Sequence, residues 1–391
     1  MKVAKRLEGI GEYYFSQKLR EIEELNKQGK NIINLGIGSP DQPPHPDVIR
    51  VLQEEAAKPH VHAYQSYKGS MVLRLAISDW YHRWYRVQLN PDEEVLPLIG
   101  SKEGIMHICM TYLNKGDEVL LPDPGYPTYN SAVKLAGGKP VNYTLKEKNN
   151  YEPDFDKLEK KGLKKVKLMF VNYPQMPTGQ LPSKELFEKL VAFGKKHQIL
   201  IVHDNPYSFI LNDDPLSLLS VEGAKETAVE LNSLSKSHNM AGWRMGMLCG
   251  AKERIEDVLR FKSNMDSGMF LPLQLAAAKA LSLGKEWQEE VNTIYRQRKE
   301  KAIELLQLLG CSYSRQQAGL FLWARVPAGF KDGYAASDDV LYGSDVFITP
   351  GGIFGKGGNQ YIRVSLCATV EKFEEAIHRI KTKMENTIYG A

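Results

Sequence analysis

The sequence contains no uninterrupted apolar run close to the roughly 20 residues that a membrane-spanning helix requires. Its first 25 residues lack the apolar core of a signal peptide and instead predict an amphipathic helix. Long runs of lysine and arginine are also missing, and the formal net charge is only +4 over 391 residues. Such a small excess gives no electrostatic footprint for DNA or RNA. We therefore predict neither a membrane nor a nucleic-acid partner.

Cysteine is scarce, and the four that occur form no CxxC pair. Cys109, Cys249, Cys311 and Cys367 each lie in an apolar stretch, which predicts buried free thiols. Free thiols are typical of a reducing compartment. Together with the missing export signal, they predict a cytoplasmic location.

Two common nucleotide-binding motifs are missing as well. The segment LGIGSP (35–40) is a lone GxG followed by proline, not the GxGxxG of a dinucleotide fold. No GxxxxGK[ST] occurs, and the glycine-rich GGIFGKGG (351–358) lacks the Ser or Thr and the long buried strand of such a site. A loop of turns is the simpler interpretation of that segment.

From about residue 95 onward, short apolar runs alternate with helix-length amphipathic segments. This alternation predicts an α/β fold with a mostly parallel sheet covered by helices on both faces. The tail differs, because a long helix near 285–309 precedes short strands and a last helix from about 370. It predicts a smaller α+β domain. The expected strands of the large sheet lie within segments 94–100, 117–127, 139–145, 165–174, 199–207, 227–235 and 243–250.

Polar side chains stand at the ends of several predicted strands. In open α/β sheets, ligands bind in the crevice outside the carboxyl ends of the strands. We therefore expect these residues to converge on one crevice. They are Gly100, Ser101 and Lys102 at a helix start, Asn172, Asp204 with Tyr207, and Ser233, Ser235 and Lys236.

The residues in this crevice fit one cofactor together better than they fit separate roles. Ser101 taken alone reads as a helix N-cap, Asp204 as a cap, and the basic bend at 230–246 as a solvated turn. A helix start flanked by Arg244, however, suits a phosphate. Lys236 is the lysine placed for a Schiff base, and Asp204 can pair with a ring nitrogen. Pyridoxal 5′-phosphate uses all of these groups.

The bend SLSKSHNMAGWRMG (233–246) resembles the S-x-S-K-x-x-x-x-x-G-x-R-x-G signature of class I aminotransferases, enzymes of fold type I that use pyridoxal phosphate. Further segments that resemble this family follow in its order: LGIGSPD, YQSYKG, GSKEGI, PDPGYP, NYPQMPTG, HDNPY and YIRVSL. They cover nearly the whole chain. The segments LIGSKEGIMH, VLLPDPGYPTY and KSNMDSGMF resemble in particular the LL-diaminopimelate aminotransferase branch.

The resemblance implies an aspartate-aminotransferase-like large domain with a seven-stranded sheet at 45–285. A small domain would combine 1–44 with 286–391. Lys236 would hold the cofactor aldehyde and move the substrate proton, Asp204 would pair with the ring nitrogen, and Tyr207 would donate to the ring hydroxyl. Tyr126 would stack on the ring, beside Asn172.

For the phosphate, the resemblance implies Ser101, Lys102, Ser233, Ser235 and Arg244, together with Tyr64 from a neighbouring subunit. The active form would then be a homodimer.

For the substrate carboxylate, the resemblance implies Arg363, beside the Gly38 backbone. One position departs from the family, which usually has an asparagine where this chain has Met176. Methionine is a weak acceptor and cannot donate, so we expect a working but atypical substrate site.

These features predict a ping-pong aminotransferase acting on an L-amino acid and a 2-oxo acid, with LL-diaminopimelate as a candidate substrate. A C–S lyase of the same fold and a non-catalytic cofactor-binding protein are the alternatives. The distal pocket would include partner residues, for which Asn264 and Ser267 are candidates.

Overall fold

The computed structural model describes residues 1–12 and 14–389. Its centre is a seven-stranded sheet with the order β2-β8-β7-β6-β5-β3-β4. Neighbouring strands are parallel except that β8 runs antiparallel to β2 and to β7. The strands are β2 (Val95–Leu98), β3 (Glu118–Asp123), β4 (Lys139–Thr144), β5 (Val166–Asn172), β6 (Leu200–Asp204), β7 (Ala228–Ser233) and β8 (Gly246–Gly250). The predicted mostly parallel sheet is therefore confirmed.

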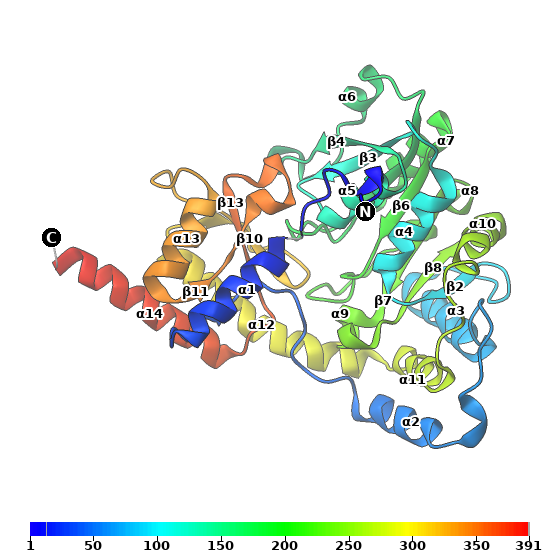
Figure 1. The fold of residues 1–391 in the computed structure, drawn as a ribbon, viewed down its shortest axis with the longest axis horizontal. Coiled ribbons are helices and arrows are strands. Elements are labelled where there is room, and N and C mark those ends of the chain that lie inside the picture. Colours follow the sequence, from blue (N-terminus) through cyan, green and yellow to red (C-terminus); the bar gives the residue numbers. More distant parts are fainter. Residues whose placement is uncertain (13, 390–391) are drawn as a thin grey trace.

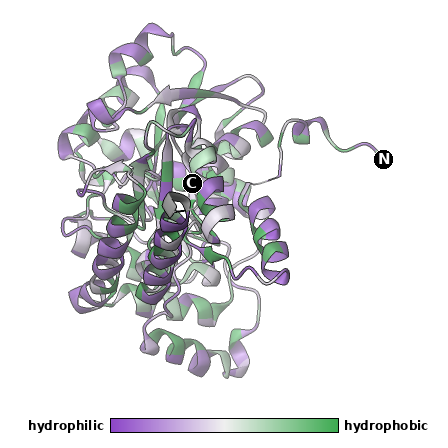
Figure 2. Cartoon of the chain, turned by 90° about the vertical axis from the view of Figure 1, so that its left-hand side faces the viewer, coloured by the Kyte–Doolittle hydropathy of each residue, from purple (hydrophilic) through white to green (hydrophobic). Residues whose placement is uncertain are grey.

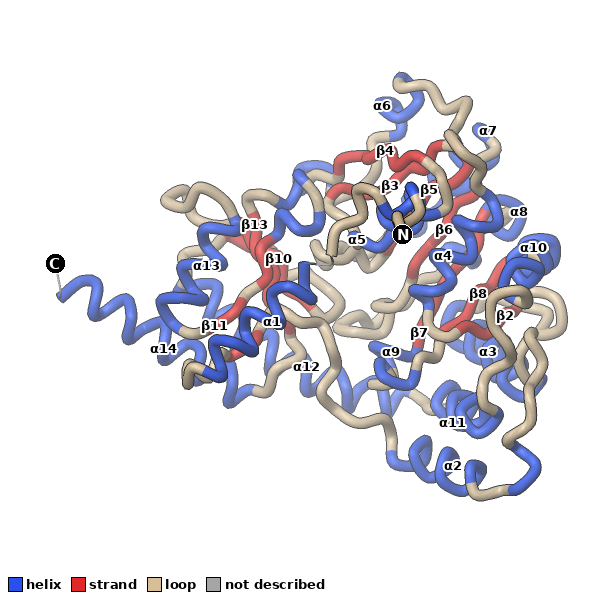
Figure 3. The backbone as a smooth tube through the Cα atoms, viewed as in Figure 1, coloured by secondary structure: helices blue, strands red, loops and turns tan. Residues whose placement is uncertain are grey.

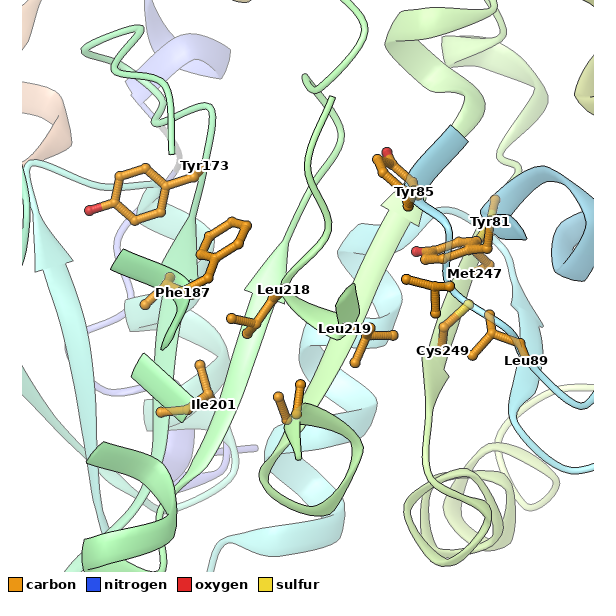
Figure 4. Packing of buried hydrophobic residues seen from close by; sticks show 14 of the residues in the cluster. Tyr81, Tyr85, Leu89, Tyr173, Phe187, Ile201, Leu218, Leu219, Met247 and Cys249 are labelled. Carbon is orange, nitrogen blue, oxygen red and sulfur yellow. The ribbon is translucent and has the colours of Figure 1, made fainter. Parts of the chain in front are cut away.

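The central strands are apolar on both faces because helices cover both sides of the sheet. Along β6, Ile201 packs into one core while Leu200 and Val202 pack into another. The first core also contains side chains of α3 (Met71–Tyr85), α7 (Lys184–His197) and α11 (Leu271–Leu281), and Figure 4 shows part of it. The second is covered by α4 (Ser101–Tyr112), α5 (Pro127–Leu135) and α10 (Lys252–Lys262).

A second group of elements lies beside the large sheet. Its four-stranded antiparallel sheet has the order β12-β13-β10-β9, and β1 pairs with β11 in a short parallel pair. In Figure 1 these strands lie with α1, α13 and α14 at the left, and Figure 3 shows the two groups of strands apart. The strands are β1 (Ile33–Asn34), β9 (Ser312–Tyr313), β10 (Phe321–Arg325), β11 (Val346–Phe347), β12 (Thr349–Pro350) and β13 (Tyr361–Ser365).

The remaining helices lie around and between both groups, and Figure 2 shows hydrophilic and hydrophobic residues alternating along the helices of the chain. They are α1 (Tyr14–Lys27), α2 (Pro46–Ala56), α6 (Phe155–Lys160), α8 (Ala224–Thr227), α9 (Leu234–Ser237), α12 (Lys285–Leu308), α13 (Gly333–Ser344) and α14 (Val370–Tyr389). None of the helices in the described ranges is long and apolar enough to cross a bilayer.

The smaller group has its own core, which joins Ile33 and Leu35 near the start of the chain to side chains of α12, β10, β13 and α14. This shared core is our reason to propose the domain division at 44/45 and 285/286, which stays a prediction. Hydrogen exchange that protects 1–44 together with 286–391 would test it.

Two local predictions need correction. The N-terminal helix begins only at Tyr14, after a short 3-10 turn at Lys5–Leu7. Cys109, Cys249 and Cys367 are buried free thiols as predicted, but Cys311 is only half-buried, since it follows the end of α12. The GGIFGKGG segment forms two short 3-10 turns, which confirms the interpretation as a loop of turns.

Candidate active site

A cavity of about 610 Å³ opens where β5, β6 and β7 end. The last residues of these strands, Asn172, Asp204 and Ser233, all line it, as expected for the carboxyl edge of a parallel sheet. Every predicted site residue except Tyr64 and the two distal-pocket candidates, Asn264 and Ser267, lines the same cavity. These residues are Gly38, Ser101, Lys102, Tyr126, Asn172, Met176, Asp204, Tyr207, Ser233, Ser235, Lys236, Arg244 and Arg363. Their assigned roles stay predictions.

Lys236 lies on the single turn of α9, directly after β7. Its Nζ donates to the carbonyl oxygen of Gly38 at 2.5 Å. Burial lowers the pKa of Lys236, and the cations of Arg363 and Arg244 lower it further against an opposing effect of Cys367. A lysine with a lowered pKa more readily presents the neutral amine that attacks a carbonyl carbon.

Asp204 is almost fully buried at the end of β6. Its Oδ2 accepts a hydrogen bond from Tyr129 Oη at 2.7 Å, while Oδ1 is buried with no hydrogen-bond partner among the described residues. Burial raises the pKa of Asp204 to about 6, although the bond from Tyr129 opposes this rise. The unpaired Oδ1 is therefore available to a donor in the cavity.

The start of α4 and the loop before β8 form the polar end of the cavity. Gly100 caps α4 with a φ of 81°, and any side chain there would overlap the Arg244 guanidinium. Glycine thus lets Arg244 lie against the open N–H groups of the helix. On the other side, Ser233 Oγ lies 2.8 Å from Ser235 Oγ. A helix start with an arginine and two hydroxyls suits a phosphate.

Arg363 lies in the middle of β13, opposite Trp323 of β10. Its Nη2 donates to the Gly36 carbonyl at 2.8 Å, and its Nη1 lies 3.4 Å from Met176 Sδ. The guanidinium carbon lies 3.7 Å from the ring centre of Phe321. Aromatic rings and the Gly36 carbonyl therefore hold this buried guanidinium in the cavity wall, where it suits an anionic substrate group.

The remaining predicted residues fill the cavity between these groups. Asn172 Nδ2 donates to the Asp204 carbonyl and its Oδ1 accepts from the Met176 N–H, both at 2.7 Å. Tyr126 packs edge-on against Tyr129. Burial raises the pKa of Tyr207 well above its ordinary value, so its hydroxyl is protonated near neutral pH.

Three predicted partner-facing residues lie outside the cavity. Tyr64 is 93% exposed, and Asn264 and Ser267 are exposed in the loop after α10. An antiparallel bridge between Gln65 and Gly268 holds the two loops together. They therefore form one surface.

Several aromatic residues of the site were not predicted from the sequence. Tyr129 lies one helical turn after Tyr126, and that spacing could have indicated that both face the same ligand. Phe15 of α1 and Phe354 of the glycine-rich turn also line the cavity. Nothing in the local pattern distinguishes these two from core residues.

Comparison with known proteins shows similarity to aminotransferases in both sequence and structure. The family model for aminotransferases of class I and II matches residues 30–380. The LL-diaminopimelate aminotransferase of Halothermothrix orenii is 40% identical over 383 residues, which cover 97% of this chain and 98% of that protein. Among solved structures, substrate-bound BacF from Bacillus subtilis is 36% identical with a TM-score of 0.93, over 98% of both chains. A variant of Thermus thermophilus aspartate aminotransferase, 24% identical over 98% of this chain and 100% of its own, shares the fold with a TM-score of 0.91.

Proposed function

Because the chain belongs to the class I and II aminotransferases, we propose that pyridoxal 5′-phosphate binds in the cavity beyond β5, β6 and β7. There the protein moves an amino group from an L-amino acid to a 2-oxo acid in two half-reactions. Bound pyridoxal phosphate supplies an electron sink that stabilises negative charge at the substrate Cα. The observation that carries the proposal is that Lys236 and Asp204 both line the same cavity.

The residues present fit this cofactor at both ends. Asp204 Oδ1, buried and unpaired among the described residues, suits the protonated ring nitrogen. The phosphate would be held by the first turn of α4, Arg244, and the Ser233 and Ser235 hydroxyls, with Lys102 adding charge at the cavity edge. Tyr126, Tyr207 and Asn172 line the space between.

Lys236 would have two functions. Its amine would hold the cofactor at the aldehyde carbon, and during the reaction its Nζ would accept the proton from the substrate Cα. Burial, which lowers the pKa of Lys236, favours the neutral amine that can accept that proton. The Gly38 carbonyl, which accepts a hydrogen bond from Nζ, holds the amine over the cavity.

Arg363 would bind the substrate α-carboxylate and thereby fix the orientation of the Cα–H bond toward Lys236. Gly38 is needed at this point because a side chain there would overlap the Phe321 ring. Met176 offers Arg363 only a thioether sulfur. The carboxylate is therefore bound with one strong donor–acceptor partner fewer than an asparagine at this position would provide.

We propose LL-diaminopimelate as an amino donor. Relatives called LL-diaminopimelate aminotransferase, 40% identical over nearly their whole length, support this proposal. The test mixes cofactor-loaded protein with single amino acids, without any oxo acid. LL-Diaminopimelate should discharge the absorbance band of the lysine-bound cofactor faster than glutamate, aspartate, alanine or aromatic amino acids. A response to the others but not to LL-diaminopimelate would overturn this substrate. Release of a 2-oxo acid with ammonia in the same mixture would instead indicate lyase chemistry.

We also propose a homodimer, because one surface carries an unusual number of exposed apolar side chains around Tyr64. Monomers rarely expose contiguous apolar patches, and a second copy of the chain would cover this one. The residues are Tyr64, Tyr67, Met71, Val72, Leu75, Met265 and Phe270. In that dimer Tyr64 would reach the phosphate of the other subunit. The cytoplasmic location remains part of the proposal, in keeping with four free cysteines.

A further inference from the structure

A fully buried histidine–glutamate pair lies on the face of the sheet opposite to Asp204. His203 of β6 and Glu230 of β7 are directly opposed in register, and each has an exposed fraction of 0%. Successive side chains of a strand point to opposite faces. His203 therefore lies behind Asp204, next to it in the chain but outside the cavity.

Glu230 is bonded as a carboxylate. Its Oε2 accepts a hydrogen bond from the Ser217 hydroxyl at 2.9 Å and another from the Leu218 N–H at 3.0 Å. A proton on this carboxyl group would therefore have to lie where a donor already points. Several hydrogen bonds to the charged form keep a buried carboxyl ionised. Oε1 accepts from Tyr81 Oη at 2.9 Å and from Asn205 Nδ2 at 3.4 Å.

His203 has an acceptor at each ring nitrogen. Nδ1 lies 2.8 Å from Glu230 Oε2, and Nε2 lies 2.9 Å from the carbonyl oxygen of Tyr173. A carbonyl oxygen cannot donate, so Nε2 must carry a proton, and the filled lone pairs of the Glu230 carboxylate require one on Nδ1 as well. Both donors together exist only in the imidazolium form.

We propose that His203 is an imidazolium and a positioning residue for Asp204, keeping the Asp204 carboxylate ionised for the cofactor ring nitrogen. This inference rests on the cofactor position proposed above. Burial raises the pKa of Asp204, and the charge of His203 acts in the opposite direction together with the Tyr129 hydrogen bond. Without it, a carboxyl buried in the sheet would tend to be neutral and could not balance a pyridinium.

Among the described residues, the hydrogen bonds of the His203 ring go only to Glu230 and Tyr173. Glu230 faces it from β7, Tyr173 from the segment after β5, and the Phe187 ring of α7 packs edge-on at 5.0 Å. The Tyr81 hydroxyl faces Glu230 from α3 and donates to it. Figure 4 shows Tyr173 and Phe187 among the buried residues of this core.

The charge is tested directly in the wild-type protein without cofactor, by ¹⁵N NMR of histidine-labelled chain. The His203 signals are assigned from their loss in His203→Gln. We expect two protonated ring nitrogens near neutral pH, because both nitrogens face acceptors. One unprotonated nitrogen at that pH would overturn the proposal, whatever the variants do.

The effect on Asp204 is tested in His203→Gln, which retains a donor but no charge. We expect about tenfold weaker pyridoxal phosphate binding and a release midpoint about one pH unit higher, because one pKa unit corresponds to a factor of ten. His107→Gln is the matched control, since His107 is equally buried but lies on α4 and is not among the groups that shift the pKa of Asp204.

The outcomes distinguish the positioning role of His203 from the proposed binding of pyridoxal phosphate. Wild-type affinity and an unchanged release midpoint in a folded His203→Gln protein would overturn the positioning role. Equal losses in His203→Gln and His107→Gln, with no shift in pH midpoint, would show only a structural effect and would also overturn it. Failure of the wild type to bind pyridoxal phosphate would contradict the proposed function instead, while the NMR result on His203 would still stand.

Discussion

At the residue scale, the Tyr129 hydroxyl helps to set the charge of Asp204. Burial raises the pKa of Asp204 to about 6, above the value near 4 of an unfolded chain. In cofactor-free protein the stability linked to this carboxyl is present below about pH 4 and is lost as the pH rises through about 6. Cofactor binding has the opposite dependence, because it needs the carboxylate, so affinity should rise through the same range.

Tyr129→Phe should therefore weaken pyridoxal phosphate binding near pH 6 and move the release midpoint upward. A hydrogen bond to a charged group contributes about 1.5–3 kcal/mol, which corresponds to about one to two pH units. Cofactor retained after desalting, measured against pH, gives the midpoint. Tyr143→Phe is the control, since the Tyr143 hydroxyl also donates from a buried position but to the Phe170 carbonyl. A midpoint shared by both variants would contradict the role of Tyr129.

Met176 offers a second prediction at this scale. In Met176→Asn, an amide oxygen would replace a sulfur that lies 3.4 Å from Arg363 Nη1, and the amide N–H could donate to the substrate carboxylate. We expect KM for the amino donor to fall about tenfold, the equivalent of about 1.4 kcal/mol. Unchanged cofactor affinity together with unchanged turnover and KM would show that this position does not matter.

At the scale of elements, the strand ends could be predicted and the contacts between elements could not. Asn172, Asp204 and Ser233 were placed together because each ends an apolar run, and parallel strands align such ends. The bond from Tyr129 to Asp204 spans 75 positions, and Phe354 reaches the cavity from a separate loop. Such contacts depend on how the helices and loops pack against one another. The spacing of apolar residues along the sequence predicts the elements but not this packing.

At the start of α4, Gly100 lets the Arg244 side chain lie close to the helix, and this close approach can be tested. Gly100→Ala adds a methyl group that would overlap the Arg244 guanidinium, so phosphate binding should weaken at least about tenfold, as expected for loss of a charge-assisted hydrogen bond. Gly116→Ala is the matched control, because Gly116 also has a positive φ, 94°, but no neighbour within 4 Å of an added Cβ.

Both glycine variants should lose about 1–3 kcal/mol of folding free energy, because a positive φ strains any residue that has a Cβ. Only Gly100→Ala should lose affinity for pyridoxal phosphate, measured by fluorescence titration alongside thermal unfolding. Equal affinities in the two variants would contradict the close approach of Arg244 to the phosphate site.

At the scale of the whole molecule, the site described in one chain lacks Tyr64, which is 93% exposed on the apolar surface. If Tyr64 serves the site of the neighbouring subunit, two inactive variants should complement each other. Tyr64→Ala retains Lys236 but gives its partner no tyrosine. Lys236→Ala loses the amine but still supplies Tyr64.

In a mixed dimer of these variants, the site with Lys236 receives Tyr64 from the other chain and is complete. Random reassociation makes about half of the dimers mixed, each with one complete site of two, so about a quarter of wild-type activity should return. Activity is measured after the two proteins are unfolded and refolded together, and each variant refolded alone is the control. No recovery, with sedimentation showing dimers, would place Tyr64 outside the shared site, and sedimentation as a monomer would contradict the dimer itself.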